Sequence, residues 1–385
     1  MVEKVEVDQS NNFKEKLLGR KANFELLRLI AMLMVVSLHY LSKGQVLSDF
    51  KDGPLSGNEY LAYLLESFSV VAVNAFVLLS GYFLVTSEFK SKKVIQLAAQ
   101  VLFYAILIPV VLTAAGVLQI QDMNIYTIFP DVFPIQTEHY WFATYYVFLY
   151  LCTPILNRAI KAMNQQQLKI CTVLLLFVFS IPKSILPLEI PIDRKGYDLI
   201  WFICVYFVAA YIRLYGIPFL EKIKNSVFLY AIMTVLIFSY ICILGAIFQR
   251  TGYLENQIKE VLHYNHILNL LSAIAFFYIF HNIKLHNGMI ARGICAISPY
   301  AFGVYLLHEH IDIRYLWPVW CHVQEMSGTS WFLLHYITTV TGIFMLGIMV
   351  DWFRSRIFRI AGKRLENGRI DRYLRQLDQA LRMKQ

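Results

Sequence analysis

Charged residues are scarce in this chain. Only 16% of its 385 residues are Asp, Glu, Lys or Arg, whereas 58% are hydrophobic. A soluble domain of this length would carry more Lys and Glu, because its surface has to be hydrated. The sequence also lacks Pro- or Ser-rich linkers and repeats of fixed period. These absences argue against a string of soluble domains and favour a single unit embedded in lipid.

Cysteine pairs of the metal-binding type are absent as well. The six cysteines fall mostly within apolar runs, and none forms a Cys-x-x-Cys pair. This pattern suggests neither a disulfide framework nor a zinc site, so we expect no bound metal. A cleavable signal peptide is not indicated either, since the region before residue 23 is polar and charged. We expect the first apolar run to remain as a signal-anchor helix.

What the sequence has instead is a series of long apolar runs. A hydrocarbon core of about 30 Å requires about 20 residues of helix to cross it. The runs therefore predict an all-α, polytopic membrane protein with about ten transmembrane helices. We expect these helices near residues 24–42, 66–85, 94–117, 140–157, 170–183, 199–215, 226–248, 264–281, 294–309 and 331–353.

The distribution of positive charge gives the orientation. With both termini in the cytoplasm, cytoplasmic segments hold 26 of the 35 Lys and Arg residues and external loops hold 8. The remaining one, Arg28, lies within the first predicted helix. This is a strong positive-inside bias. It explains the net charge of +9 without a nucleic-acid partner.

Three regions follow from this topology. We expect a cytoplasmic N-terminal tail over residues 1–22, a transmembrane domain over 23–354 and a basic cytoplasmic tail over 355–385. From Arg354 onward the chain carries ten basic residues. Such a tail suits a short interfacial helix on anionic lipid, although a solvated tail that only sets topology is an equal alternative.

Two ionisable residues lie within the first apolar run. A charged side chain at membrane depth costs roughly 2.5–3.5 kcal/mol on insertion scales and usually faces a cavity or a partner. Arg28 and His39 are eleven positions apart, so they lie within about 20° of the same helical stripe and about 16.5 Å apart along the axis. The alternative is that Arg28 snorkels or pairs with Glu25, while His39 merely sits at the interface.

A second polar group is expected at the cytoplasmic end of the next helix. Ser80, Gly81 and Tyr82 end an apolar run, and Lys90 and Lys93 follow. A small Ser-Gly step permits close approach of a ligand, and lysines suit phosphate. Helix packing and topology signals are the plainer explanations of the same residues.

A third group gathers at helix ends on the external side. His139, Trp141 and Tyr145 open one helix, whereas Tyr305, His308 and Glu309 close another. Tyr305 and His308 share a helical face because they are three positions apart. An interfacial aromatic belt would explain the aromatic residues equally well.

Together these motifs resemble the membrane acyltransferase-3 family, whose bacterial members modify cell-surface glycans. The matching elements are the Arg-(ten residues)-His pattern of Arg28 and His39, the Phe76–Leu84 element around Ser80-Gly81-Tyr82, the Trp141-Phe142 pair and the stretch from Ser298 to His308. Lys90 and Lys93 stand where the family usually has Arg-x-x-Arg. The resemblance covers about residues 20–355.

The resemblance implies an O-acetyltransferase of the bacterial inner membrane. Its donor would be cytoplasmic acetyl-coenzyme A, with no permanently bound cofactor, and its acceptor a hydroxyl of a lipid-linked or cell-surface glycan such as capsule or lipopolysaccharide. Arg28, Lys90 and Lys93, with Ser80, Gly81 and Tyr82, would hold the donor phosphates. His39 would act as general base, assisted by His308 or Glu309, and His139, Trp141, Tyr145 and Tyr305 would bind the sugar.

The main alternative is a transporter or flippase for a lipid-linked sugar. Such proteins also use buried charge and aromatic residues, and they often consist of two related halves with broken helices. No second half repeats the Arg28–His39 pattern here. A glycan polymerase is a weaker alternative, because no external loop is large.

Overall fold

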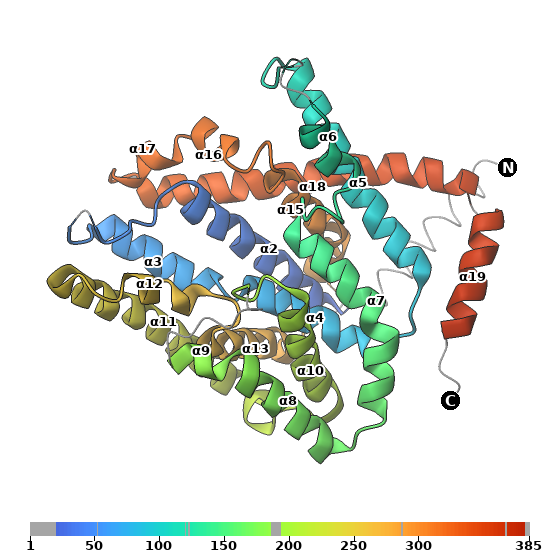
Figure 1. Ribbon diagram of the computed structural model, residues 1–385, viewed down its shortest axis with the longest axis horizontal. Helices are drawn as coiled ribbons and strands as arrows, with labels where there is room; N and C mark the ends of the chain where they lie inside the picture. The colour runs from blue at the N-terminus through green and yellow to red at the C-terminus, as the bar shows by residue number, and fades with distance from the viewer. Residues whose placement is uncertain are drawn as a thin grey trace.

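The computed structural model describes residues 21–51, 53–119, 121, 124–185, 194–285, 288–365 and 368–381. All regular structure in these ranges is helical, and no strand occurs in them. The predicted all-α class is therefore confirmed. Figure 1 shows a bundle of long helices with several short ones at its ends.

Each of the ten apolar segments predicted from the sequence coincides with a helix or with two successive helices. The α-helices are α2 (Ala22–Lys43), α3 (Gly57–Ser69), α4 (Ala72–Leu84), α5 (Ser91–Ala114), α6 (Ile125–Val132), α7 (Trp141–Lys161), α8 (Gln165–Phe179), α9 (Ile181–Ile185), α10 (Leu199–Tyr215), α11 (Ile223–Thr251), α12 (Glu255–Ile258), α13 (Ile267–Asn282), α14 (Met289–Ile297), α15 (Ala301–His308), α16 (Leu316–Trp320), α17 (Val323–Ser327), α18 (Phe332–Leu365) and α19 (Arg369–Leu381). Short 3₁₀ turns occupy Pro218–Glu221, Glu260–Leu262 and Ser298–Tyr300.

Six of the described helical stretches are long and apolar enough to cross a membrane. They are Ala22–Lys43, Gly57–Leu84, Ser91–Ala114, Ile223–Thr251, Met289–His308 and Phe332–Ile360. The helices α8 and α10 are apolar but shorter. These six stretches indicate a multi-pass membrane protein, while the count of about ten and the cytoplasmic termini stay predictions. The helix α18 continues to Leu365, beyond the predicted boundary at residue 354.

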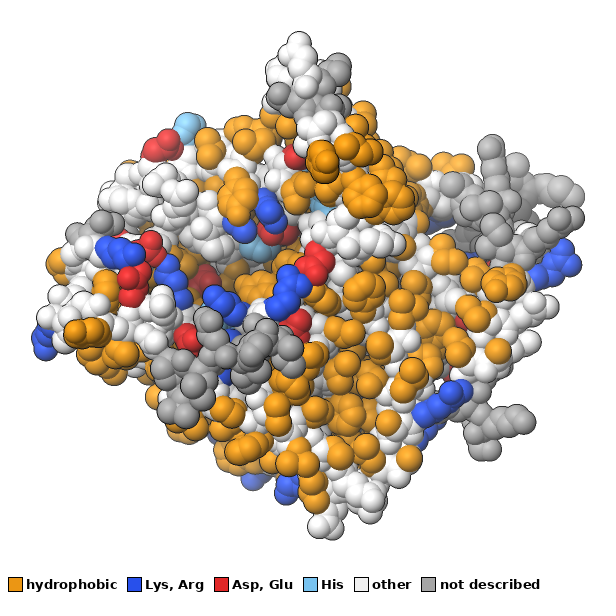
Figure 2. All heavy atoms as spheres, viewed as in Figure 1, with side chains coloured by type: hydrophobic (Ala, Val, Ile, Leu, Met, Phe, Trp, Pro, Cys, Tyr) orange, Lys and Arg blue, Asp and Glu red, His pale blue; other side chains and the backbone are white. Residues whose placement is uncertain are grey.

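The most buried helices lie in the middle of the bundle. In the most apolar 18-residue window of each stretch, the buried share is 72% in α3–α4 and 61% in α2, but only 28% in α5 and 22% in α11. Large hydrophobic side chains are correspondingly exposed on the outer helices, for example Val110 on α5 and Phe228 on α11. Figure 2 shows hydrophobic side chains spread over much of one face, with charged ones gathered toward its upper left. This distribution suits a bundle whose outer helices face lipid.

The central helix α2 defines two ends of the bundle. The helix α4 runs back alongside it, so that Phe24 near the start of α2 lies 5.5 Å, between ring centroids, from Tyr82 near the end of α4. We call this the Arg28 end and the opposite end of α2 the His39 end. Residues that are remote in sequence therefore meet at both ends.

The short helix α15 crosses α18 at close range. A Cβ atom on Gly303 would lie 2.3 Å from Asp351, and one on Gly347 would lie 2.6 Å from Val304. Small residues at such a crossing let two helix backbones approach. Asp351 is fully buried, and it accepts hydrogen bonds from Gln100 at 3.0 Å and Tyr104 at 3.1 Å. This crossing fixes the position of α15, which carries His308 at its end.

Candidate active site

His39 and His308 meet at the His39 end of the bundle. His39 lies near the C-terminus of α2 and His308 is the last residue of α15. The distance between His39 Nδ1 and His308 Nε2 is 2.8 Å, a normal hydrogen bond. Two histidines that the sequence predicts at the ends of separate helices are thus joined by a hydrogen bond.

The partners of this pair assign its protons. His308 Nδ1 lies 2.5 Å from the backbone carbonyl of Val304, which only accepts, so Nδ1 carries the hydrogen. The other nitrogen of neutral His308, Nε2, is then an acceptor and receives the N–H of His39 Nδ1. His39 is left with an unprotonated Nε2, which is the form required of a general base.

Glu309 completes the cluster. Its Oε2 atom lies 3.3 Å from His39 Nδ1, and its side chain is only 5% exposed. Arg314 Nη1 lies 3.7 Å from the other carboxylate oxygen. A carboxylate at this distance stabilises the imidazolium that forms when His39 accepts a proton. Arg314, in the segment after α15, was not among the residues selected from the sequence.

A narrow cavity lies beside His39. Its volume is about 40 Å³ and its lining is apolar and aromatic. The lining residues come from α2, α4, α7, α15 and the segment before α13: Met32, Val35, Leu38, His39, Val73, Phe76, Trp141, Phe142, Tyr264, Phe302 and Tyr305. Two of the predicted sugar-binding residues, Trp141 and Tyr305, therefore share a cavity with the predicted base.

A buried amide holds one wall of this cavity in place. Asn74 Nδ2 donates to the carbonyl of Tyr264 at 2.8 Å, and Asn74 Oδ1 accepts from Trp201 Nε1 at 2.9 Å. Tyr264 in turn stacks on Trp141 with ring planes 17° apart. Since Gly196 packs against Asn265 at a φ of +83°, a side chain there would be strained. The position of Trp141 is thus set by residues far from it in sequence.

The Arg28 end carries a different set of side chains. Arg28 pairs with Glu25, as one of the two sequence interpretations proposed, and its side chain remains 33% exposed. Tyr82 lies under the Arg213 guanidinium, which is 4.7 Å from the ring centroid, and its hydroxyl is 3.5 Å from His281 Nε2. Arg213 and His281 were not selected from the sequence. Arg213 ends an apolar helix, where its charge was counted only as a topology signal.

A comparison with known families decides the identity of this arrangement. A model described as an acyltransferase domain, that of the acyltransferase-3 family, matches residues 21–350. The chain belongs to the acyltransferase-3 family. No curated protein and no solved structure in the comparisons matches it. The predicted family is confirmed, and the protein is a multi-pass membrane acyltransferase.

One predicted donor-binding residue of this acyltransferase, Gly81, lies at a helix–helix contact. A Cβ atom on Gly81 would lie 2.7 Å from Ala209 Cβ of α10, so the close approach at Gly81 is made by another helix. Ser80 precedes it on the same turn of α4 and is half-buried. The donor-binding role of Ser80 and Gly81 stays a prediction.

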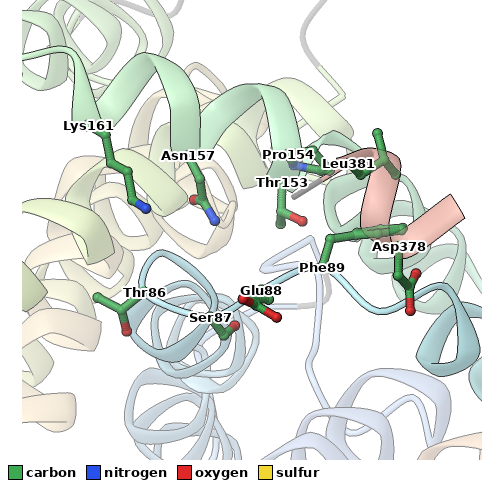
Figure 3. A pocket seen from close by; sticks show the side chains of 10 residues that line it. All are labelled: Thr86, Ser87, Glu88, Phe89, Thr153, Pro154, Asn157, Lys161, Asp378 and Leu381. Carbon is green, nitrogen blue, oxygen red and sulfur yellow. The ribbon is translucent and has the colours of Figure 1, made fainter. Parts of the chain in front are cut away.

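The two predicted lysines are exposed at the start of α5. The backbone N–H of Lys90 donates to the Tyr150 hydroxyl at 3.1 Å, whereas no contact joins Lys90 or Lys93 to Arg28 among the described residues. A pocket of about 210 Å³ lies nearby, between the segment after α4, the helix α7 and the C-terminal helix α19. Figure 3 shows Lys161 and Asn157 pointing into it from α7, with Asp378 at its edge.

Tyr145 of the acyltransferase lies outside the His39 cavity. Its hydroxyl is 2.5 Å from Glu138 Oε1, and Arg194 donates to both oxygens of that carboxylate at 2.7 and 2.8 Å. The hydrogen bond with Arg194 holds the pKa of Glu138 below its usual range. The Tyr145 hydroxyl is therefore engaged within the protein.

His139 also lies outside the cavity, in a second histidine cluster. Asp131, His139 and His310 each offer a ligand atom within 4.8 Å of the others. Burial lowers the pKa of His139 to about 4 and that of His310 to about 3, so both imidazoles are neutral. Burial also raises the pKa of Asp131 to about 7. His139 thus contacts other protein groups at a place separate from the His39 cavity.

Proposed function

We propose that this acyltransferase moves an acetyl group from acetyl-coenzyme A to a hydroxyl of a lipid-linked or cell-surface glycan, with His39 as general base. The observation that carries the proposal is the free Nε2 of His39 beside an aromatic cavity, with Nδ1 fixed by His308. A neutral imidazole held in one orientation is suited to remove a proton from a hydroxyl.

In the proposed transfer, His39 takes up one proton and then returns it. The acceptor oxygen attacks the thioester carbonyl while His39 Nε2 takes the hydroxyl proton, so that a C–O bond forms. The C–S bond then breaks, and the departing thiolate of coenzyme A takes the proton from His39. Glu309, 3.3 Å from His39 Nδ1, stabilises the positive charge that His39 carries between these events.

The donor would enter at the Arg28 end, which we assign to the cytoplasm. Arg28 together with Arg213 supplies positive charge there for the phosphates of coenzyme A. The pantetheine arm would then follow α2 over the axial distance of about 16.5 Å to His39. Lys90 and Lys93, which are exposed nearby, would contribute through long-range attraction.

The acceptor sugar would approach the His39 end, which we assign to the external face of a bacterial inner membrane. Trp141 and Tyr305 line the cavity there and offer aromatic faces for a sugar ring. Capsular polysaccharide and lipopolysaccharide precursors have such hydroxyls. The C-terminal helix α19 would lie at the opposite, cytoplasmic side, where its basic residues face anionic lipid.

Binding and transfer measured on the same sample test this proposal. The full chain in lipid nanodiscs should be stabilised thermally by acetyl-coenzyme A, and labelled acetyl should appear in a glycan acceptor, as followed by mass spectrometry. Arg28→Ala should raise the KM for acetyl-coenzyme A by about tenfold, corresponding to about 1.4 kcal/mol.

A flippase would give the opposite pattern. It would move a labelled lipid-linked sugar across a vesicle membrane with no effect of acetyl-coenzyme A on its thermal stability. That result, or full acetylation by a stably inserted His39→Ala variant, would contradict the proposed function.

A further inference from the structure

Asp131, His139 and His310 form a cluster that has no role in the proposed acyl transfer. Asp131 belongs to α6, His139 lies just before α7, and His310 follows α15. Three segments far apart in sequence thus bring two imidazoles and one carboxylate together, with their ligand atoms within 4.8 Å of one another. Two imidazoles and a carboxylate form a common ligand set for zinc.

The hydrogen bonding of this cluster is incomplete. Neither ring nitrogen of His139 makes a hydrogen bond of acceptable geometry, although the Pro130 carbonyl is near, and its side chain is 0% exposed. Asp131 Oδ1 is buried without a hydrogen-bond partner as well. Buried polar atoms are ordinarily satisfied, because leaving one unpaired costs roughly 1–3 kcal/mol. An unpaired imidazole and an unpaired carboxylate oxygen that face each other are the sign of a group that binds between them.

The spacing of two of these ligand atoms suits a bound cation. With metal–ligand bonds of about 2.0–2.1 Å, the ligand atoms of a tetrahedral site lie about 3.3 Å apart. Asp131 Oδ1 and His139 Nδ1 are 3.4 Å apart, which is close to that separation. His39 and His308 are 2.8 Å apart, and a proton already joins their nitrogens. His39 Nδ1 and Glu309 Oε2 have a similar separation of 3.3 Å, but His39 Nδ1 is already joined to His308, whereas the His139 nitrogens make no hydrogen bond of acceptable geometry.

The surroundings of His310 suit a ligand role. Its Nε2 lies 3.4 Å from the carbonyl of Ala105, an arrangement in which one ring nitrogen faces a backbone carbonyl and leaves Nδ1 for a metal. Nδ1 is 3.6 Å from Asp312 Oδ2 and accepts the Asp312 backbone N–H at 3.2 Å, a hydrogen bond that an ion bound at Nδ1 would replace.

We propose that Asp131, His139 and His310 bind one zinc ion, which joins the segment before α7 to the segment after α15. His310 directly follows Glu309, so the ion would anchor the chain next to the carboxylate that faces His39. The site is independent of the identity of the acyl donor and acceptor, because its ligands lie outside the His39 cavity. Its role is to hold the loops at this end in place.

Metal content is the direct test. The full chain, purified with a histidine-free affinity tag and without chelators, is analysed by inductively coupled plasma mass spectrometry. We expect about one zinc per chain, and a decrease of at least about tenfold in His139→Ala and in Asp131→Asn. His322→Ala is the matched control, since His322 is exposed and paired only with Glu325, and it should keep the zinc.

A spectroscopic measurement separates the loss of a metal ligand from misfolding of the variant. Wild-type protein reconstituted with Co²⁺ should show the intense visible absorption of a tetrahedral nitrogen–oxygen site, and Asp131→Asn, which preserves side-chain shape, should lose it. EDTA should lower the Tm of the wild type but leave that of Asp131→Asn unchanged. Zinc absent from the wild type, another metal in its place, or equal zinc in the His139 and His322 variants would overturn the proposal.

Discussion

Two histidine clusters lie next to each other at the His39 end, and they differ in how their nitrogens are used. In the cluster of His39, His308 and Glu309, a chain of hydrogen bonds leads from the Val304 carbonyl to one free nitrogen. In the cluster of Asp131, His139 and His310, both nitrogens of His139 lack a hydrogen bond. The peptide bond between Glu309 and His310 separates them.

The difference shows that burial alone does not indicate what a histidine does. Both clusters are well buried, yet one has a defined tautomer and an adjacent cavity, and the other has three ligand atoms within 4.8 Å of one another. The first arrangement suits proton transfer and the second suits cation binding. Substitutions that affect one cluster and leave the other unchanged test this distinction.

The largest effect is expected for His39→Ala. Removing the proposed base should lower the rate of acetyl transfer by about 10²–10⁴-fold. Zinc content should stay at the wild-type level, because His39 has no contact with the second cluster. Turnover of purified protein in nanodiscs and elemental analysis of the same sample check both parts. A parallel loss of zinc would show that the two clusters are not separate.

A smaller effect is expected for Glu309→Gln. The amide keeps the shape but removes the negative charge 3.3 Å from His39 Nδ1, so the transition state loses a stabilising partner. We expect kcat to fall by about tenfold to hundredfold while the KM for acetyl-coenzyme A changes little. Steady-state kinetics separate these parameters. A change confined to KM would place Glu309 in substrate binding instead.

A still smaller effect on activity is expected for His139→Ala. The His39–His308 hydrogen bond does not involve His139, so acetyl transfer should fall by less than about tenfold even when zinc is lost. The Tm should decrease, and added EDTA should not lower it further. An activity loss as large as that of His39→Ala would mean that His139 contacts the substrate directly.

The smallest difference in effect between the two clusters is expected for Gly303→Ala. The new Cβ would lie 2.3 Å from Asp351, so α15 and α18 would have to separate, at a cost of about 1–3 kcal/mol in the free energy of unfolding. Because His308 ends α15 and His310 comes two residues later, activity and zinc affinity should fall together by similar small factors. Denaturation in detergent, transfer assays and zinc titration measure the three quantities. Gly293→Ala, at an open position on α14, is the control.

The sequence supplied the helices and the most informative residues of the site. Apolar runs of membrane length depend only on local composition, so all ten segments were found as helices. The Arg28–His39 spacing and the position of His308 at a helix end also followed from the chain itself. Their family resemblance is confirmed by the match over residues 21–350.

Contacts between distant segments were beyond such reasoning. Nothing local to Tyr145 indicates that Arg194 and Glu138 engage its hydroxyl, and nothing in the Ser80-Gly81 step reveals that Ala209 approaches it. Asp131 lies in the short helix α6, outside the predicted membrane helices, and the expectation of no bound metal rested on the spacing of the cysteines. Its pairing with His139 and His310 requires the three-dimensional arrangement.

The hydrogen bonds of the His39–His308 pair also limit the number of protons that the pair can accept. Between the Val304 carbonyl and the free end of His39 there are four ring nitrogens, two of them already bearing hydrogen and one occupied as an acceptor. The pair therefore has capacity for a single additional proton, at a single atom. In the proposed reaction, each turnover protonates His39 Nε2, and this nitrogen must lose its proton before the next acceptor can react. Deprotonation of His39 is therefore an obligatory step of every cycle.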